Sequence, residues 1–145
     1  MKVKQLSLFV ENRPGQLMIP CQILADAGIS IQTLSLADTD QFGILRLIVK
    51  EWEAAKKVLE EAGCVVTVTD MVAVEVPDHP GGLAKVLKEM EHSGVNVEYM
   101  YAFTCKRGDR AILLFRFDNP DLALSKMAGH PLSAITCDCL NGCFD

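Results

Sequence analysis

Apolar and polar residues alternate along the start of the chain, from Val3 to Val10. The regularly spaced apolar residues fall on one side of an extended segment, and they are Leu6, Leu8 and Val10. This two-residue period is typical of a strand with one buried face. Pro14 and Gly15 end the alternation, because proline and glycine favour a turn.

A helical period follows the turn. One stripe of apolar or small residues recurs at helical spacing and consists of Leu17, Cys21, Leu24 and Gly28. The stripe predicts an amphipathic helix that ends at Gly28. Pro20 is tolerated only near the first turn of such a helix, where backbone donors lack helical partners, so the start of the helix stays open.

The elements that follow complete an order of βαββαβ. Residues 29–37 and 43–50 are apolar enough for two strands joined by a turn at 38–41. One helix face before Gly63 carries Trp52, Ala55, Leu59 and Ala62. Residues 65–69 are mostly β-branched, which favours a strand.

The chain then repeats itself at an offset of 66 residues. Pro-Gly-x-Leu at 14–17 recurs at 80–83, and Gly-Ile-Ser-Ile at 28–31 meets Gly-Val-Asn-Val at 94–97. Ala62-Gly63 meets Ala128-Gly129 at the same offset. Matches at one offset indicate an internal duplication, with one domain over 1–70 and a second over 71–145.

The second repeat predicts the same elements. Residues 72–76, 95–103, 111–117 and 134–137 read as strands, with a turn at 106–109. Residues 120–128 read as a short helix that begins at Pro120. The other helix, stopped at Gly94, carries an apolar stripe of Leu83, Val86, Leu87 and Met90.

The order βαββαβ predicts an α+β fold of two ferredoxin-like units. Right-handed crossovers place both helices of a unit on one face of a four-stranded antiparallel sheet. The other face must be solvated or covered by a neighbour. The two units abut near Asp70 with almost no linker.

Composition narrows the classes of function. The chain has 145 residues, half of them hydrophobic, which is enough for two small cores. Its net charge is -5, and neither half is basic, so we expect neither nucleic-acid nor anionic-membrane binding. No apolar run approaches the ~20 residues that span a bilayer. The polar N-terminus does not read as a signal peptide, and we expect a cytoplasmic protein.

Cysteine and histidine give no clear catalytic or metal site. The six cysteines are expected to be reduced thiols, since no secretion signal is visible. Cys137, Cys139 and Cys143 could ligate a soft metal, but a fourth ligand is missing, so ordinary tail thiols are favoured. His79, His92 and His130 form no local catalytic set. We therefore expect no metal, no cofactor and no enzyme activity.

The loop between the first strand and first helix of each repeat carries the most chemistry. A helix start presents unpaired N–H groups that suit a carboxylate, and glycine lets a ligand approach the backbone. Asn12 and Asp78 occupy equivalent positions and can each accept a hydrogen bond from an ammonium group. The loops therefore predict an α-amino-acid site. The alternative interpretation is a tight turn with a helix-capping residue.

Both repeats resemble the ACT domain family. The resemblance is carried by residues 11–17 and 28–31 in the first repeat and by residues 80–83 and 94–98 in the second. The resemblance covers residues 3–69 and 71–137. ACT domains regulate phosphoglycerate dehydrogenase, acetolactate synthase and related amino-acid enzymes. In that family two domains commonly pair edge to edge into an eight-stranded sheet, and amino acids bind between the first loop of one domain and the second strand of its partner.

The resemblance implies two ligand-binding sets. The first comprises Glu11, Asn12, Arg13, Pro14, Gly15, Gln16, Leu17, Ser30 and Ile31. The second comprises Asp78, His79, Pro80, Gly81, Gly82, Leu83, Asn96 and Val97. Ser30 is shorter than the amide often found at the second strand, and the charge of Asp78 would favour a cationic group.

Together these observations predict a regulatory sensor of an amino acid or similar small ligand, acting as a homodimer on an unidentified enzyme or regulator. Two alternatives stay open. One is an interaction module without a ligand. The other is a small acylphosphatase-like enzyme in which Arg13 holds an anion, although no phosphate-loop motif surrounds it.

Overall fold

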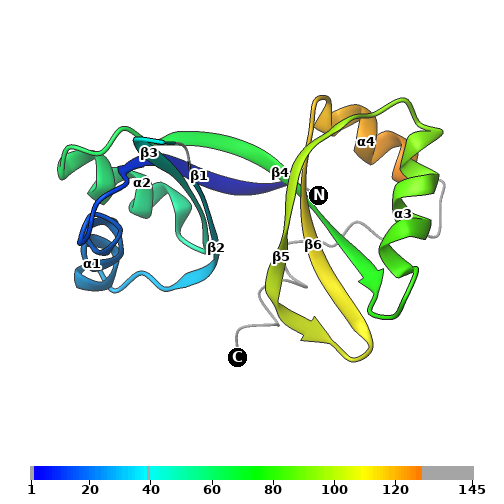
Figure 1. Cartoon of the computed structure of the whole chain (residues 1–145), viewed down its shortest axis with the longest axis horizontal. Coiled ribbons are helices and arrows are strands. Elements are labelled where there is room, and N and C mark those ends of the chain that lie inside the picture. Colours follow the sequence, from blue (N-terminus) through cyan, green and yellow to red (C-terminus); the bar gives the residue numbers. More distant parts are fainter. Residues whose placement is uncertain (1, 39, 129–145) are drawn as a thin grey trace. The chain divides into compact units, whose positions relative to one another are not determined.

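The computed structural model describes residues 2–38 and 40–128. The elements, in chain order, are β1 (Lys2–Glu11), α1 (Met18–Asp26), β2 (Ile31–Asp38), β3 (Phe42–Val49), α2 (Trp52–Glu61), β4 (Thr67–Pro77), α3 (Gly82–Glu91), β5 (Val97–Arg107), β6 (Arg110–Phe117) and α4 (Pro120–Met127) (Figure 1). These elements confirm the α+β class. The predicted strand at 134–137 and the three tail cysteines lie outside the described residues.

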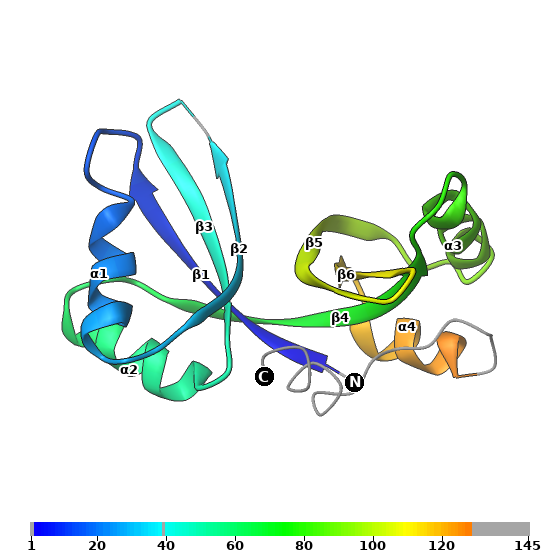
Figure 2. The same cartoon turned by 90° about the horizontal axis from the view of Figure 1, so that it is seen from below.

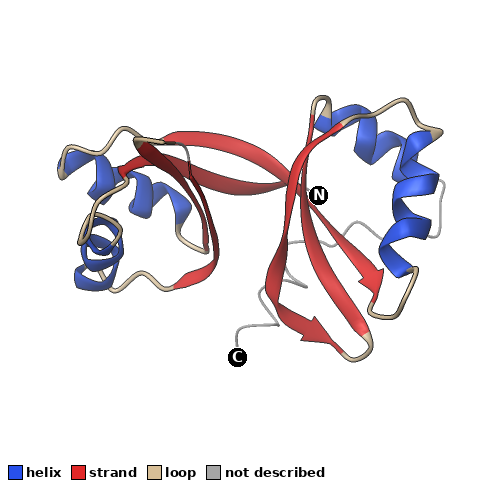
Figure 3. Cartoon of the chain, viewed as in Figure 1, coloured by secondary structure: helices blue, strands red, loops and turns tan. Residues whose placement is uncertain are grey.

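The strands form one six-stranded sheet in the order β2-β3-β1-β4-β6-β5. The ladders β1–β3, β2–β3, β4–β6 and β5–β6 are antiparallel. The predicted strands at 65–69 and 72–76 are one strand, β4, since nothing between them breaks the ladder (Figure 3). Asp70, at the junction, is polar but does not force a turn. The eight-stranded sheet is not formed by the described residues, in which β2 and β5 are the outer strands.

The chain divides into two compact units. The N-terminal unit is Lys4–Thr69, and the C-terminal unit is Met1–Val3 with the chain from Asp70 onward. Both β1 and β4 therefore contribute residues to both units. Within the C-terminal unit, Lys2 Nζ lies 2.9 Å from Asp121 Oδ1 and 3.6 Å from Asp70 Oδ2. Hydrogen bonding and charge attraction, chiefly from Asp121, raise the pKa of Lys2.

The core of the N-terminal unit lies between one face of its strands and both of its helices. Leu6 pairs with Leu47 and Leu8 with Leu45, so these side chains share one face. Leu24 of α1 joins the same buried cluster. From α2 the cluster takes Ala55 and Leu59. Both helices therefore cover one face of the sheet, as the crossovers predict (Figure 2).

The C-terminal unit repeats this core. Val72 of β4 pairs with Phe115 of β6, and both are fully buried against α3 and α4. The rings of Phe115 and Phe117 stack with centroids 5.5 Å apart. The helix residues of this cluster are Val86, Met90, Ala123 and Met127.

The offset between equivalent core positions changes within the repeat. Leu6 and Val72 are equivalent at 66 residues, but their partners Leu47 and Phe115 are 68 apart. The hairpin between β5 and β6 therefore contains two more residues than the hairpin between β2 and β3. Sequence matching alone, which found 66 throughout, does not reveal this insertion.

The two units differ on the sheet face that their helices leave uncovered. Phe9 of the N-terminal unit is 71% exposed there. Its equivalent in the C-terminal unit is Glu75, which is half-buried, and on the same face Met71, Ala73 and Leu114 are fully buried. The face of Phe9 also holds buried residues, since Gln5 and Ile48 on it are 0% and 1% exposed.

Helix α1 begins two residues before Pro20, which places this proline in the first turn. The helix starts at Met18, so the missing N–H of Pro20 falls in the first turn and no helical hydrogen bond is lost. Helix α3 starts earlier relative to its loop, at Gly82. A Cβ on Gly82 would lie 2.0 Å from the carbonyl oxygen of Pro77. Only glycine fits there, whereas Gln16 occupies the equivalent position before α1.

None of the helices within residues 2–38 and 40–128 is long and apolar enough to cross a membrane.

Two adjacent valines test the position of the N-terminal core. Val66 is 8% exposed within the core, whereas Val65 is 79% exposed. We expect Val66→Ala to lower the free energy of unfolding by about 2 kcal/mol, because two buried methyl groups are lost. Val65→Ala should change it by less than about 0.5 kcal/mol. Urea denaturation of both variants measures this, and equal losses would contradict the described core.

The close approach at Gly82 gives a second test. Gly82→Ala should lower the free energy of unfolding by about 2–3 kcal/mol, because the new methyl group must displace the backbone at Pro77. Gln16→Ala, at the equivalent position of the other unit, should change the free energy of unfolding by less than about 0.5 kcal/mol. Chemical denaturation measures both. A neutral Gly82→Ala would show that α3 does not start against β4.

Candidate functional site

The candidate site of the N-terminal unit is the loop from Glu11 to Leu17, between β1 and α1. Gly15 has φ +83°, a backbone conformation that favours glycine. Apart from Gly15 and its two chain neighbours, no described residue has an atom within 4 Å of a Cβ built on Gly15, so the corner of the loop is open. Asn12, Arg13 and Pro14 are exposed, and Gln16 is half-buried.

The loop from Asp78 to Gly81 repeats this geometry before α3. Gly81 has φ +86°, and a Cβ built on it also meets no described atom within 4 Å. The backbone N–H of Gly82 donates to the carbonyl oxygen of His79 at 3.0 Å. The Nδ1 of His79 lies 3.0 Å from the carbonyl oxygen of Pro80, a distance at which Nδ1–H would donate. Duplication has thus preserved the backbone conformation as well as the sequence.

Neither loop caps its helix with a side chain. Helices α1 and α3 have no side-chain cap hydrogen bond and no acidic residue in the first turn. Helix α4 has both, since Asn119 Oδ1 accepts from the N–H of Leu122 at 3.0 Å and Asp121 lies in the first turn. The N-cap residues are Leu17 and Gly81, so neither Asn12 nor Asp78 occupies the N-cap position. The positive ends of α1 and α3 keep their affinity for an anion.

A hairpin turn lies beside each loop, which sequence reasoning missed. The N–H of Asn12 donates to the carbonyl oxygen of Gln41 at 3.0 Å, and the N–H of Asp78 donates to that of Asp109 at 2.8 Å. The antiparallel pairing of Glu11 with Phe42 brings them together. The period-two pattern of the strands predicts this neighbourhood only once the sheet order is known.

Arg13 forms an ion pair with Glu11 of the same loop. Its Nε donates to Glu11 Oε2 at 2.5 Å, and both side chains are largely exposed. An arginine that holds a reacting phosphate would need its guanidinium free for the anion. This ion pair does not favour the acylphosphatase-like interpretation.

The residues expected from the second strand lie away from the loops of their own units. Ser30 and Asn96 are exposed and precede β2 and β5 by one residue, at Ile31 and Val97. Helix α1 separates Asn12 from Ser30, and nine helical residues span about 13 Å. One ligand cannot contact both ends of this helix. Any site that combines a loop with Ser30 or Asn96 therefore needs two units.

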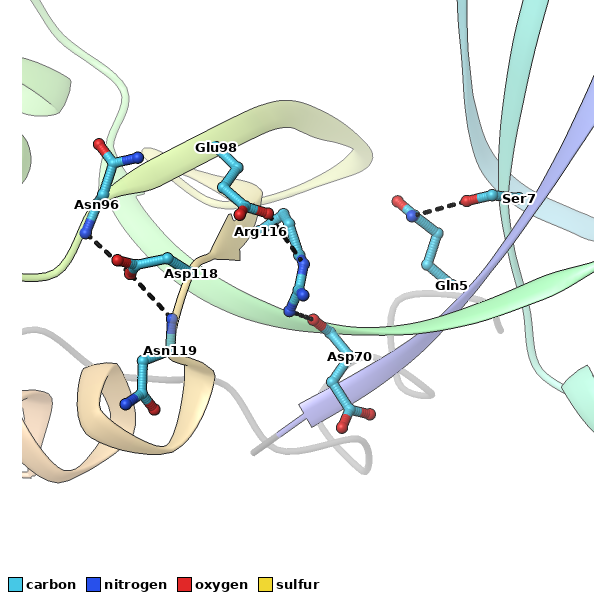
Figure 4. Close-up of polar contacts among 8 residues, drawn as sticks. All are labelled: Gln5, Ser7, Asp70, Asn96, Glu98, Arg116, Asp118 and Asn119. Carbon is cyan, nitrogen blue, oxygen red and sulfur yellow. Dashed lines mark hydrogen bonds and ion pairs between the residues drawn. The ribbon is translucent and has the colours of Figure 1, made fainter.

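Asn96 has a fixed backbone (Figure 4). Its N–H donates to Asp118 Oδ1 at 3.0 Å, and its carbonyl oxygen accepts from the N–H of Asp118 at 3.1 Å. The same Asp118 oxygen accepts from the N–H of Asn119 at 2.9 Å. Nearby, Arg116 Nε lies 3.3 Å from Glu98 Oε2. The Asn96 side chain thus projects from a well-anchored segment.

The thiols show no metal site in the part of the chain that the structure describes. Cys21 and Cys64 are free. No group of three or more histidine, cysteine, aspartate or glutamate side chains among the described residues could hold a metal ion.

Comparison with known proteins agrees with this fold. Residues 1–139 match the family profile of the ACT domain pair. The crystal structure of protein BT0572 from Bacteroides thetaiotaomicron is 36% identical, with 93% of this chain and 92% of that chain covered and a TM-score of 0.86. No curated protein matches the sequence significantly.

Regulatory subunits of aspartate kinase share the fold at lower identity. The ligand-free subunit from Thermus thermophilus is 18% identical, with 88% and 91% of the two chains covered and a TM-score of 0.62. The subunit from Thermus flavus is also 18% identical, with 88% and 92% covered and a TM-score of 0.61. The duplicated βαββαβ order, the paired loops and the match over residues 1–139 identify this chain as a member of the ACT family, built as an ACT domain pair.

Proposed function

We propose that this ACT domain pair is a regulatory sensor that binds a free α-amino acid at its strand-to-helix loops and has no catalytic role. The observation that carries the proposal is the repeated loop geometry. Each loop combines an open glycine corner with a helix start whose N-cap residue, Leu17 or Gly81, makes no side-chain cap hydrogen bond. The aspartate kinase subunits of similar fold are themselves regulatory, which supports the same role here.

The loop groups suit the two charges of an amino acid. The first-turn N–H groups of α1 and α3 would bind the carboxylate. The side chains of Asn12 and Asp78 would accept from the ammonium group. The protein would need no metal or organic cofactor. Asp78 carries a charge that Asn12 lacks, so the second site would favour the more cationic ligand.

We further propose that each site is completed by Ser30 or Asn96 of another unit, with Ile31 or Val97 beside it. The separation of Asn12 from Ser30 within one unit supports a shared site. Edge-to-edge pairing at β2 or β5 would join an outer strand to that of a second copy and extend the six-stranded sheet. Ligand binding would then shift the pairing of units or chains, and with it the state of a partner enzyme or regulator.

The N-terminal unit has the surface for such pairing. β2 is an outer strand, and its Leu34 and Leu36 are 45% and 49% exposed. In the same unit, Met18 and Ile19 of α1 are 63% and 46% exposed. Exposed apolar residues of this size on an unpaired edge favour association with a second copy, as a homodimer.

A thermal-shift screen of the twenty amino acids tests the sensor. A ligand at a hundredfold over its dissociation constant should add about 2.7 kcal/mol of stability and raise the melting temperature. Asn12→Ala or Asp78→Ala should reduce the shift and the two together should abolish it, because the ammonium group loses its acceptor in each loop. Glu53→Ala, an exposed change on α2, is the matched control. The absence of any shift would favour an interaction module instead, and turnover of acylphosphates would favour an enzyme.

The proposed pairing has its own test. Leu34→Lys should raise the dissociation constant of the homodimer at least tenfold, because the lysine charge would be buried at the β2 edge. Sedimentation equilibrium measures the mass. Leu122→Lys, at a 37% exposed position on α4, should leave the dissociation constant of the homodimer unchanged. A dimer that resists Leu34→Lys would place the pairing elsewhere.

A further inference from the structure

A pocket of about 200 Å³ lies in the C-terminal unit between the end of α3 and the helix α4. Its apolar lining consists of Met90, Val95, Phe117, Ala123 and Met127. Four polar residues complete it, namely Glu89, His92, Ser93 and Lys126. The pocket lies at the opposite end of α3 from the Asp78–Gly81 loop, about 15 Å along a ten-residue helix.

The N-terminal unit fills the same place with its own side chains. Met90 is equivalent to Leu24 and Met127 to Leu59, since each pair holds the same core position. The residues beside them, Glu89 and Lys126, are therefore equivalent to Ile23 and Val58. Both of those are apolar and pack against the N-terminal core. Ile23 and Val58, which pack against the core of the N-terminal unit, are thus replaced in the C-terminal unit by two oppositely charged residues that line a pocket.

The charges of the pocket have no partners within the described chain. Glu89 Oε2 is shielded from solvent and accepts no hydrogen bond from any described residue. A buried carboxylate oxygen without a donor is costly, so this position favours a ligand that donates. No described acidic side chain pairs with Lys126. The Ser93 hydroxyl is already engaged, since it donates to the carbonyl oxygen of Met90.

We infer that this pocket is a second binding site, selective for a small zwitterion with an apolar side chain, such as an aliphatic α-amino acid. Glu89 accepts from the ammonium group, Lys126 binds the carboxylate, and the apolar lining takes the side chain. The volume, below the range of about 300–1,000 Å³ typical of drug-sized ligands, limits the occupant to a molecule of this size. The inference goes beyond the loop sites, and neither depends on the other.

Calorimetric titration of the full chain with L-valine, L-leucine and L-methionine tests the inference. The titrated chain carries Asn12→Ala and Asp78→Ala, so that the proposed loop sites do not contribute to the measured heat. We expect saturable binding of at least one of them, weakened about tenfold or more by Glu89→Gln and by Lys126→Met. The double variant Glu89→Ile and Lys126→Val copies the N-terminal unit. It should abolish this binding while keeping or raising the melting temperature, which separates loss of the site from loss of the fold.

Two comparisons decide the outcome. Because Asn12→Ala and Asp78→Ala remove the loop sites from the titrated chain, binding that remains belongs to the pocket, and failure of the loop sites is distinguishable from failure of the pocket. Isopentylamine and 4-methylpentanoate, which each lack one charge of leucine, should bind at least tenfold more weakly. Binding that survives when Glu89→Ile and Lys126→Val are added, an analogue that binds as tightly as L-leucine, or no binding of any of the three amino acids would overturn the inference.

Discussion

The antiparallel ladder between the first and third strands of each unit is the constraint on which the rest depends. Leu6 opposite Leu47, and Val72 opposite Phe115, set the register of the two ladders. A slip of one residue would turn every one of these side chains to the other face. The same ladder brings the start of the third strand beside the end of the first. It thereby fixes each glycine loop against its hairpin turn, so one register determines both the core and the candidate site.

Much of this arrangement could be predicted from local pattern. Strict alternation around Leu8 and the helical stripe around Leu24 each report a single buried face, and both residues are buried as expected. Pro20 marked the first turn of its helix. The continuity of β4 could not be predicted, because β-branched residues on both sides of Asp70 fit one strand or two. The two-residue insertion in the hairpin between β5 and β6 could not be predicted either, because matches between short motifs do not detect it.

The candidate loops were predicted from residue types, whereas their surroundings required the sheet order. Gly15 and Gly81 signalled a turn, and both have the positive φ that such turns use. Nothing local to Asn12 points to Gln41, because their proximity arises from strands that pair across the hairpin. Glu89 and Lys126 were missed for a related reason. On a helix they read as ordinary solvated charges, and only their apolar counterparts Ile23 and Val58 make them unusual.

The continuity of β4 through Asp70 has an evolutionary consequence. Because β1 and β4 each belong to both units, a cut between Thr69 and Asp70 would divide a strand and would part Lys2 from its carboxylate neighbours. A cut there would cost both halves hydrogen-bonded backbone. Side chains of the two halves can therefore diverge, as Ile23 and Glu89 have done, while the shared strands favour keeping the halves in one chain.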